Sequence, residues 1–176
     1  MTFAPEVRPV WLLDVDGVLN AARPGWDEVP GQGKAFVDGT CYRLRWAPPL
    51  TRRITALHHS GAVEIRWATT WVDHITQVER LLRLPKLPTA FIGLDPDEVD
   101  PTELKVCAAL DVVELERRPL IWTDDDAIPG TGPLLDRLQA AGVPVLLLAP
   151  GSRIGLQPED LDVIDDFLTE LTAMAS

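Results

Sequence analysis

Short apolar runs alternate with segments of helical periodicity along this chain of 176 residues. Five runs have the length and composition of buried strands, at residues 10–13, 63–68, 90–92, 120–123 and 143–148. Between and after them, apolar residues recur every three or four positions and predict helices, at residues 50–57, 71–82, 134–141 and 158–171 and in a short stretch capped by Thr102. Strands that alternate with helices favour a mostly parallel sheet covered on both faces.

We therefore expect a single α/β domain over residues 1–176, folded as a Rossmann-like three-layer sandwich. Its five-stranded sheet is expected in the order 3-2-1-4-5, with the strands numbered along the chain. A chain of this length can bury one full hydrophobic core and is too short for two.

The segment between Asn20 and Pro48 lacks a helical period. Residues 35–46 predict a β-hairpin around Asp38-Gly39, because this dipeptide is favoured in tight hairpin turns. We interpret residues 20–48 as a flap, a minimal cap inserted after the first strand.

Charge and composition limit the classes of partner. The chain has 16 Lys and Arg against 27 Asp and Glu, a net charge of −11. This balance disfavours strong nucleic-acid binding by the chain itself, but it allows a small phosphorylated substrate in a local basic pocket. Residues 1–9 lack the apolar core of a signal peptide, and no later stretch reaches the length of a membrane span. We expect a cytoplasmic protein without membrane contacts.

Acidic and hydroxyl side chains stand where the predicted strands end. Asp14 and Asp16 close the first strand, Thr69 and Thr70 the second, and residues 124–126, all aspartates, follow the fourth. Ligands of open α/β sheets bind outside the carboxyl ends of the strands, so these groups should converge. Clustered carboxylates hold protons unless a cation offsets their repulsion, and Mg²⁺ prefers oxygen ligands. The sequence therefore predicts a magnesium site that recruits phosphate. A single pair of aspartates would more simply be a solvated turn.

Four short motifs resemble, in order and spacing, those of the haloacid dehalogenase (HAD) superfamily. They are Asp14-Val15-Asp16-Gly17-Val18, the threonine Thr69, the helical lysine Lys105 and the pair Asp124-Asp125. The resemblance covers residues 10 to about 150. The stretches around Trp67-Ala68-Thr69-Thr70-Trp71 and Ile121-Trp122-Thr123-Asp124 also look like a narrower group of HAD-domain proteins without a large cap, some of which are domains of RNA-repair proteins.

The resemblance implies a phosphatase that works through a covalent intermediate. Asp14 would attack phosphorus and form an aspartyl-phosphate. Asp16 would protonate the leaving oxygen and then deprotonate the attacking water. Superfamily members that transfer phosphoryl groups to water carry Asp at this second position, whereas dehalogenases lack it.

The resemblance also implies the binding residues. Thr69, with Thr70 one residue away, and Lys105 would bind the phosphate. The metal set would be Asp14, the backbone carbonyl of Asp16 and Asp125, with Asp124 more distant or bridged through water. Which of residues 124–126 is the direct ligand stays open.

Other residues near the predicted site have two interpretations each. His74 either faces the site or points away from it. The arginines either bind a substrate phosphate or ribose or are solvated: Arg23, Arg43 and Arg45. The tryptophans either stack on a base or another flat group or pack in the core or at its rim: Trp26, Trp46 and Trp71. Asp126 is either a third carboxylate or part of a helix cap or solvated turn. Residues 95–103 form an acidic run, interpreted as an exposed loop or, less simply, a calcium site.

The leading hypothesis is a Mg²⁺-dependent phosphatase for an accessible phosphomonoester. Its short flap suggests an open site. Such a site could take a small phosphorylated substrate or the phosphorylated end of a larger molecule, including a nucleic-acid 3′-phosphate. Alternatively, the partner in a homodimer could close the site. The alternative is a non-catalytic module that binds or regulates through the same fold. A mutase is disfavoured, since it usually needs a larger cap.

Overall fold

A parallel sheet of four strands forms the centre of the computed structural model, which describes residues 7–93 and 99–175. The strand order is β4-β1-β5-β6, and each neighbouring pair is parallel. The bounds are β1 (Val10–Leu13), β4 (Glu64–Trp67), β5 (Leu120–Thr123) and β6 (Val145–Leu148). The carboxyl ends of β1, β4 and β5 therefore lie side by side, as the predicted site requires.

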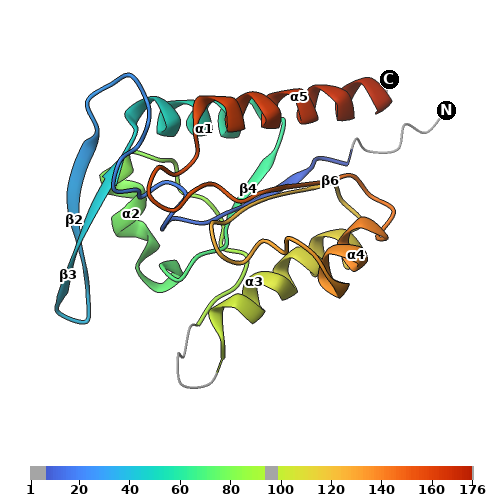
Figure 1. Ribbon diagram of the computed structural model, residues 1–176, viewed down its shortest axis with the longest axis horizontal. Coiled ribbons are helices and arrows are strands. Elements are labelled where there is room, and N and C mark those ends of the chain that lie inside the picture. Colours follow the sequence, from blue (N-terminus) through green and yellow to red (C-terminus); the bar gives the residue numbers. More distant parts are fainter. Residues whose placement is uncertain (1–6, 94–98, 176) are drawn as a thin grey trace.

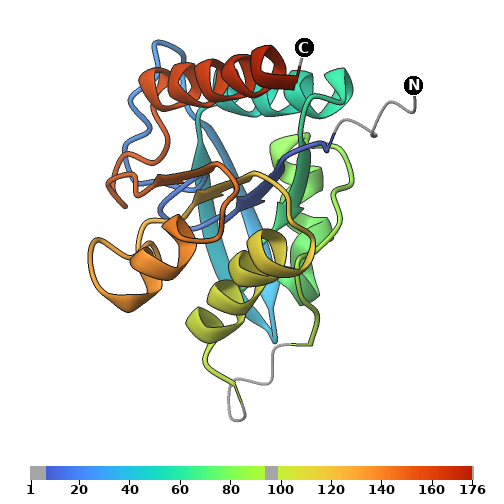
Figure 2. The ribbon, with the colours of Figure 1, turned by 90° about the vertical axis from the view of Figure 1, so that its right-hand side faces the viewer.

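Helices cover both faces of the sheet. Figure 2 shows α1 (Pro48–Ser60) and α5 (Pro158–Ala175) side by side over one face. The other face is covered by α3 (Pro101–Leu110), its π-helical extension η2 (Asp111–Leu115) and α4 (Pro133–Gln139) (Figure 1). The 3₁₀ turn η1 (Val72–His74) leads into α2 (Ile75–Leu82), which lies beside the flap. Among the described residues, no helix is both long and apolar enough to span a bilayer.

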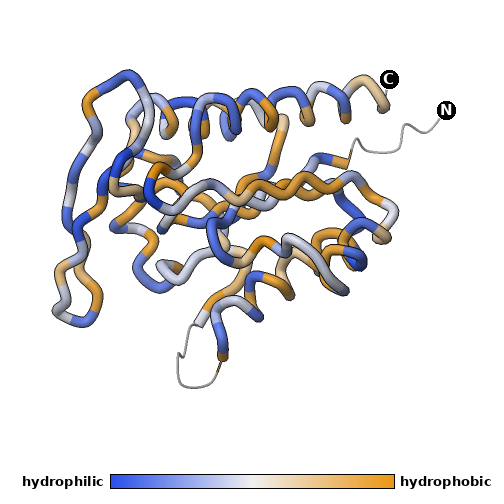
Figure 3. Tube along the Cα trace, in the orientation of Figure 1, coloured by the Kyte–Doolittle hydropathy of each residue, from blue (hydrophilic) through white to orange (hydrophobic). Residues whose placement is uncertain are grey.

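Alternating side chains of the strands divide the core into two layers. On β1, Trp11 and Leu13 pack with α1 and α5, whereas Val10 and Leu12 pack with α3 and α4. All four are fully buried. Strands buried on both faces read as continuous apolar runs, which is why these runs were recognisable in the sequence. Figure 3 shows this apolar centre and the more polar outer turns of the helices.

The prediction of a fifth strand at residues 90–92 is wrong. One isolated parallel bridge joins Thr89 to Trp67, through a bond from the Ala90 amide to the Trp67 carbonyl at 2.8 Å and one from the Trp67 amide to Pro88 at 2.9 Å. Pro88 has no amide hydrogen for a ladder, and Gly93 follows closely. The segment thus touches the expected edge of the sheet without becoming a strand. The order of the other four strands agrees with the prediction.

The flap is a two-stranded antiparallel hairpin of β2 (Gly31–Val37) and β3 (Thr40–Trp46). Asp38 and Gly39 at its tip both have positive φ, 49° and 81°, as in the predicted tight turn. One face of the hairpin buries Ala35 and Leu44, and the other is exposed. Figure 1 shows it standing beyond the end of the sheet.

The predicted helix caps were partly correct. Gly61 ends α1 with a positive φ of 73°, as expected of a glycine stop. The predicted cap at Thr102 is wrong, because Asp100 is the N-cap of α3 and its side chain accepts from the Thr102 amide at 2.8 Å. Asp fits the N-cap position because its side-chain oxygen can accept from a backbone amide in the first turn of the helix, which has no partner within the helix.

Candidate active site

The loop that follows β1 turns sharply and returns beside its own start. The amides of residues 18–20 converge on the carbonyl of Val15 at 2.8–3.3 Å. Gly17 has a φ of 70°, and its amide donates to the Asn20 carbonyl at 2.9 Å. This turn brings the Asn20 side chain to Asp16, where Nδ2 donates to Oδ1 at 2.7 Å.

Lys105 of α3 lies between two buried aspartates. Its Nζ donates to Asp14 Oδ2 and to Asp124 Oδ2, both at 2.7 Å. The three residues are 8%, 5% and 0% exposed, respectively. One buried cation thus faces two carboxylates, so the pair has excess negative charge whenever both are ionised.

Asp124 and Asp125 have different surroundings. Asp124 Oδ1 accepts from the amides of Asp126 and Ala127 at 3.0 and 2.8 Å, so this carboxylate is held firmly and orients Lys105. Asp125 is half-buried and lies against Gly17, where an added Cβ would fall 2.1 Å from Asp125 Cγ. The two loops therefore meet closely only because residue 17 has no side chain.

Carboxylate oxygens of Asp14, Asp124 and Asp125 lie within 4.8 Å of one another. Three oxygen donors at this spacing suit a single hard divalent cation such as Mg²⁺, which binds through carboxylates and retains water ligands. The donor set therefore fits the metal that the sequence suggested.

Burial and neighbouring charges together shift the pKa values of this cluster. Burial raises the pKa of Asp14 from the usual 3.8 to about 7; the charge of Lys105 opposes the rise and that of Asp124 adds to it. Burial and the charge of Asp124 also raise the pKa of Asp125. Burial disfavours the Lys105 ammonium, but the charges of and hydrogen bonds to Asp14 and Asp124 outweigh it and raise its pKa. A cation among these carboxylates would favour their ionised forms.

The two threonines after β4 differ in position. Thr69 is fully buried, and hydrogen bonding to its side chain lowers the pKa of Asp14; its Oγ1 accepts from the Trp71 amide at 3.4 Å. Thr70 is exposed. Of the two candidates for phosphate binding, Thr69 is thus the one next to Asp14.

Asp16 is exposed, in contrast to Asp14, but hydrogen bonds hold both oxygens of its carboxylate. Oδ1 accepts from Asn20, and Oδ2 accepts from Trp71 Nε1 at 2.8 Å. Sequence reasoning assigned no role to Asn20 and considered Trp71 only for stacking or packing. The available signals were an amide four residues after Asp16 and an indole directly after the threonine pair.

The remaining candidate residues lie in the core, in turns or at the surface. Trp46 is buried, and Trp26 donates its indole to the Leu156 carbonyl at 2.8 Å, so both pack within the fold. Asp126 is exposed in a turn and caps no helix, since α4 begins at Pro133. Exposed or half-buried positions are taken by Arg23, Arg43, Arg45 and His74. Of the acidic run 95–103, residues 95–98 lie outside the described residues.

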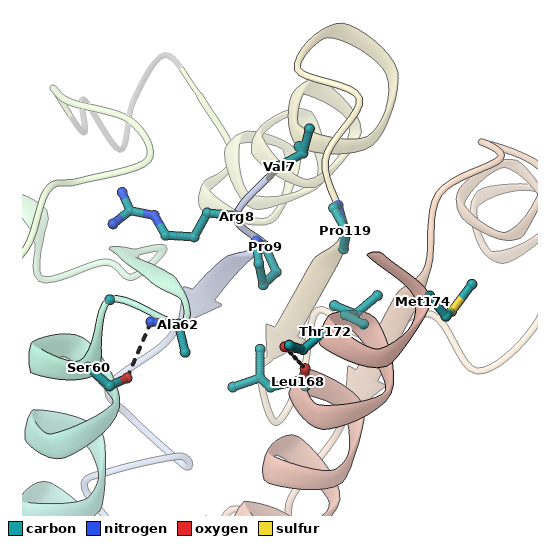
Figure 4. Close-up of a pocket in the computed structure, with 11 residues that line it drawn as sticks. Val7, Arg8, Pro9, Ser60, Ala62, Pro119, Leu168, Thr172 and Met174 are labelled. Atoms are coloured by element: carbon teal, nitrogen blue, oxygen red, sulfur yellow. Dashed lines mark hydrogen bonds between the residues drawn. The ribbon is translucent and has the colours of Figure 1, made fainter. Parts of the chain in front are cut away.

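A cavity of about 620 Å³ opens at the opposite end of the sheet. Figure 4 shows Pro9 and Pro119, the residues before β1 and β5, beside Leu168 and Thr172 of α5. Among the lining residues that the structure describes, Arg8 is the one that carries a charge. This cavity is separate from the carboxylates and lies at the amino ends of the strands, where open α/β sheets do not bind ligands.

No protein-family model matches this chain, and searches of curated proteins and of solved structures found no match either. The functional interpretation therefore depends on the geometry of the site.

Proposed function

We propose that this chain is a magnesium-dependent phosphatase of the HAD type that hydrolyses a phosphomonoester through an aspartyl-phosphate on Asp14. The observation that carries the proposal is the contact of Lys105 with Asp14 and Asp124, with Asp125 completing a carboxylate cluster within 4.8 Å. A buried nucleophilic carboxylate beside a fixed cation and a metal-binding donor set is what attack on an anionic phosphate requires, because the charge repulsion must be offset.

Two steps follow from this arrangement. Asp14 attacks phosphorus, the bond from phosphorus to the leaving oxygen breaks, and Asp16 gives that oxygen a proton. Water then attacks the aspartyl-phosphate, Asp16 takes its proton, and inorganic phosphate leaves with the Asp14 carboxylate restored. Thr69 and Lys105 hold phosphate oxygens.

Mg²⁺ would be held by the carboxylates of Asp14 and Asp125 and by the backbone carbonyl of Asp16. Asp124 supports this set through Lys105, because its oxygens already accept from Lys105 and from two backbone amides. When bound, the ion supplies positive charge that offsets the repulsion between the carboxylates and the phosphate.

Phosphate release from p-nitrophenyl phosphate, with Mg²⁺ or with EDTA, tests the proposal. We expect turnover only with the metal, and a loss of at least about 10³-fold in Asp14→Asn, since the nucleophile is removed. Asp136→Asn, which changes an exposed aspartate of α4, should keep full activity. Turnover in EDTA, or equal turnover by Asp14→Asn, would contradict the proposed mechanism, and no turnover with Mg²⁺ would favour a non-catalytic module.

A substrate with several phosphates, such as a nucleic-acid end, is a second candidate. On the exposed face of the flap, Lys34 lies opposite Arg43 in the neighbouring strand, and Arg45 lies two pairs further along on the same face. The Arg45 amide donates to Asn20 Oδ1, and Asn20 Nδ2 donates to Asp16, so the backbone of β3 at Arg45 is one residue removed from Asp16. Such a face favours additional phosphates on the substrate.

A comparison of a nucleoside 3′-monophosphate with a short oligonucleotide that ends in a 3′-phosphate tests this second candidate. Arg43→Glu should raise KM for the oligonucleotide alone, and Lys86→Glu, an equal charge change at another exposed site, should not. Equal KM changes for both substrates would exclude it.

A further inference from the structure

We propose that Trp71 and Asn20 are positioning residues for Asp16, and that strand β3 of the flap holds both of them in place. This inference rests on the proposed function, in which Asp16 transfers the proton.

The first support of Asp16 comes from Trp71. Its indole Nε1 donates to Asp16 Oδ2 at 2.8 Å, and the side chain is only 6% exposed. Tyr42 of β3 contacts the indole edge to face, with ring centroids 5.5 Å apart and an interplanar angle of 81°. The flap therefore helps to confine the ring whose N–H points at the carboxylate.

The second support comes from Asn20. Its Nδ2 donates to Asp16 Oδ1 at 2.7 Å, while its own Oδ1 accepts from the Arg45 amide at 2.8 Å. The Ala21 amide in turn donates to the Arg45 carbonyl at 2.9 Å. Because Arg45 belongs to the same strand as Tyr42, one strand fixes both donors of Asp16.

An exposed aspartate would otherwise sample several rotamers. With one donor on each oxygen, the Asp16 carboxylate has a defined plane and direction. Proton transfer needs the donor and acceptor atoms in hydrogen-bond reach, and loss of alignment lowers its rate. The flap thus acts on the chemistry through the orientation of Asp16.

Substrates with different leaving groups separate this role from a structural one. p-Nitrophenolate leaves without needing a proton, whereas an alkoxide must be protonated as the bond breaks. The ratio kcat/KM reports the steps up to departure of the leaving group. In Trp71→Phe and in Asn20→Ala we expect kcat/KM for an alkyl phosphate such as β-glycerophosphate to fall roughly 10- to 100-fold, and that for p-nitrophenyl phosphate by less than about 3-fold.

Trp26→Phe is the matched control. It also loses one indole hydrogen bond in a partly buried position, but its partner is the Leu156 carbonyl. Both substrates should react with it as with the wild type. In an Asp16→Asn background, Trp71→Phe should cause no further selective loss, because a residue that acts through Asp16 has nothing left to position.

The outcomes are distinguishable. An equal fall for both substrates in Trp71→Phe and Asn20→Ala would overturn the inference and leave the proposed function intact. Asn20→Ala decides alone if Trp71→Phe does not fold. No metal-dependent turnover by the wild type would overturn the proposed function, and this inference with it.

Discussion

Asp14 lies in surroundings that favour its protonated form when no metal is bound. Its pKa of about 7 in the folded protein exceeds the usual 3.8, so between these values the folded chain binds a proton more tightly than the unfolded chain. The stabilisation from the protonated form is complete below about pH 4 and is lost as the pH rises through about 7.

Asp14→Asn cannot titrate at this position. In EDTA, we expect the melting temperature of the variant to increase relative to that of the wild type as the pH rises from about 4 to about 7. Above about pH 7 the difference between the two melting temperatures should stay constant. Thermal melts across this interval measure the gap. A melting-temperature difference, variant minus wild type, that stays constant or falls with rising pH would contradict the prediction.

Gly17 is the residue on which the approach of the two acidic loops depends. Its φ is 70°, and a Cβ would stand 2.1 Å from Asp125 Cγ. We expect Gly17→Ala to displace Asp125. The proposed phosphatase activity should fall at least about 10-fold, and Mg²⁺ should raise the melting temperature less than in the wild type. These effects come in addition to a loss of stability of about 1–2 kcal/mol, because alanine disfavours a positive φ.

Gly61→Ala is the control for this backbone cost. Gly61 has a similar φ of 73° and no atom within 4 Å of its Cβ position. The Gly61→Ala variant should lose about as much stability as Gly17→Ala and keep its activity. Equal activity in the two variants would show that the contact with Asp125 is unimportant.

At the scale of residues, the convergence of Asp14, Thr69, Lys105 and Asp124 followed from strand ends and from motif order. The partners of Asp16 did not. They depend on the three-amide turn around Val15 and on the direction of one indole N–H, and neither follows from spacing along the chain.

At the scale of elements, Glu79 connects α2 to the central sheet. It is 7% exposed, and its Oε1 accepts from Trp67 Nε1 of β4 and from the Leu87 amide, both at 2.9 Å. Glu79→Ala leaves two buried donors without an acceptor, and we expect a loss of about 2–4 kcal/mol in the free energy of unfolding.

Glu79→Gln retains an acceptor oxygen and should lose less than half of that amount. Urea unfolding of the three proteins gives the comparison. A glutamine variant as unstable as the alanine variant would mean that the charge, not the hydrogen bonds, matters.

The periodic helices and the hairpin were predictable because each is encoded locally, by an apolar stripe or by Asp38-Gly39. The strand at residues 90–92 was predicted wrongly because a short apolar run has no period that separates a strand from a bridged loop. The π-helical turn η2, closed by the bond from the Glu116 amide to the Asp111 carbonyl at 2.9 Å, has no sequence signature of its own.

At the scale of the whole molecule, a charged network joins segments at the amino edge of the sheet. Glu64 of β4 pairs with Arg66 and with Arg118, which precedes β5, each at 2.7 Å. Burial opposes ionisation of Glu64, but hydrogen bonds from and the charges of these arginines outweigh it and lower its pKa to about 2. The resulting stabilisation is present above about pH 4.5 and is lost as the pH falls towards about 2.

We therefore expect Glu64→Gln to be less stable than the wild type at neutral pH, with a difference that shrinks as the pH falls from about 4.5 to about 2. The side chain is 23% exposed, so added salt should also reduce the difference. Chemical unfolding at several pH values measures it, and a difference that grows in acid would contradict the assignment.

Alternation of strands and helices was sufficient to predict the layers, whereas this network depends on which strands become neighbours.

The contact of Gly155 with the loop after β1 has a consequence for the order in which a nascent chain can become functional. The Leu156 amide donates to the Val18 carbonyl at 2.9 Å, and a Cβ on Gly155 would lie 2.5 Å from that oxygen. The loop that holds Asp14 is translated before its supports, because Lys105 follows Asp14 by 91 residues and Leu156 lies further along the chain. Contacts so distant along the chain form slowly. Asp14, the proposed nucleophile, is thus made before the residues that hold its loop, and its surroundings are complete only after Leu156 has been made.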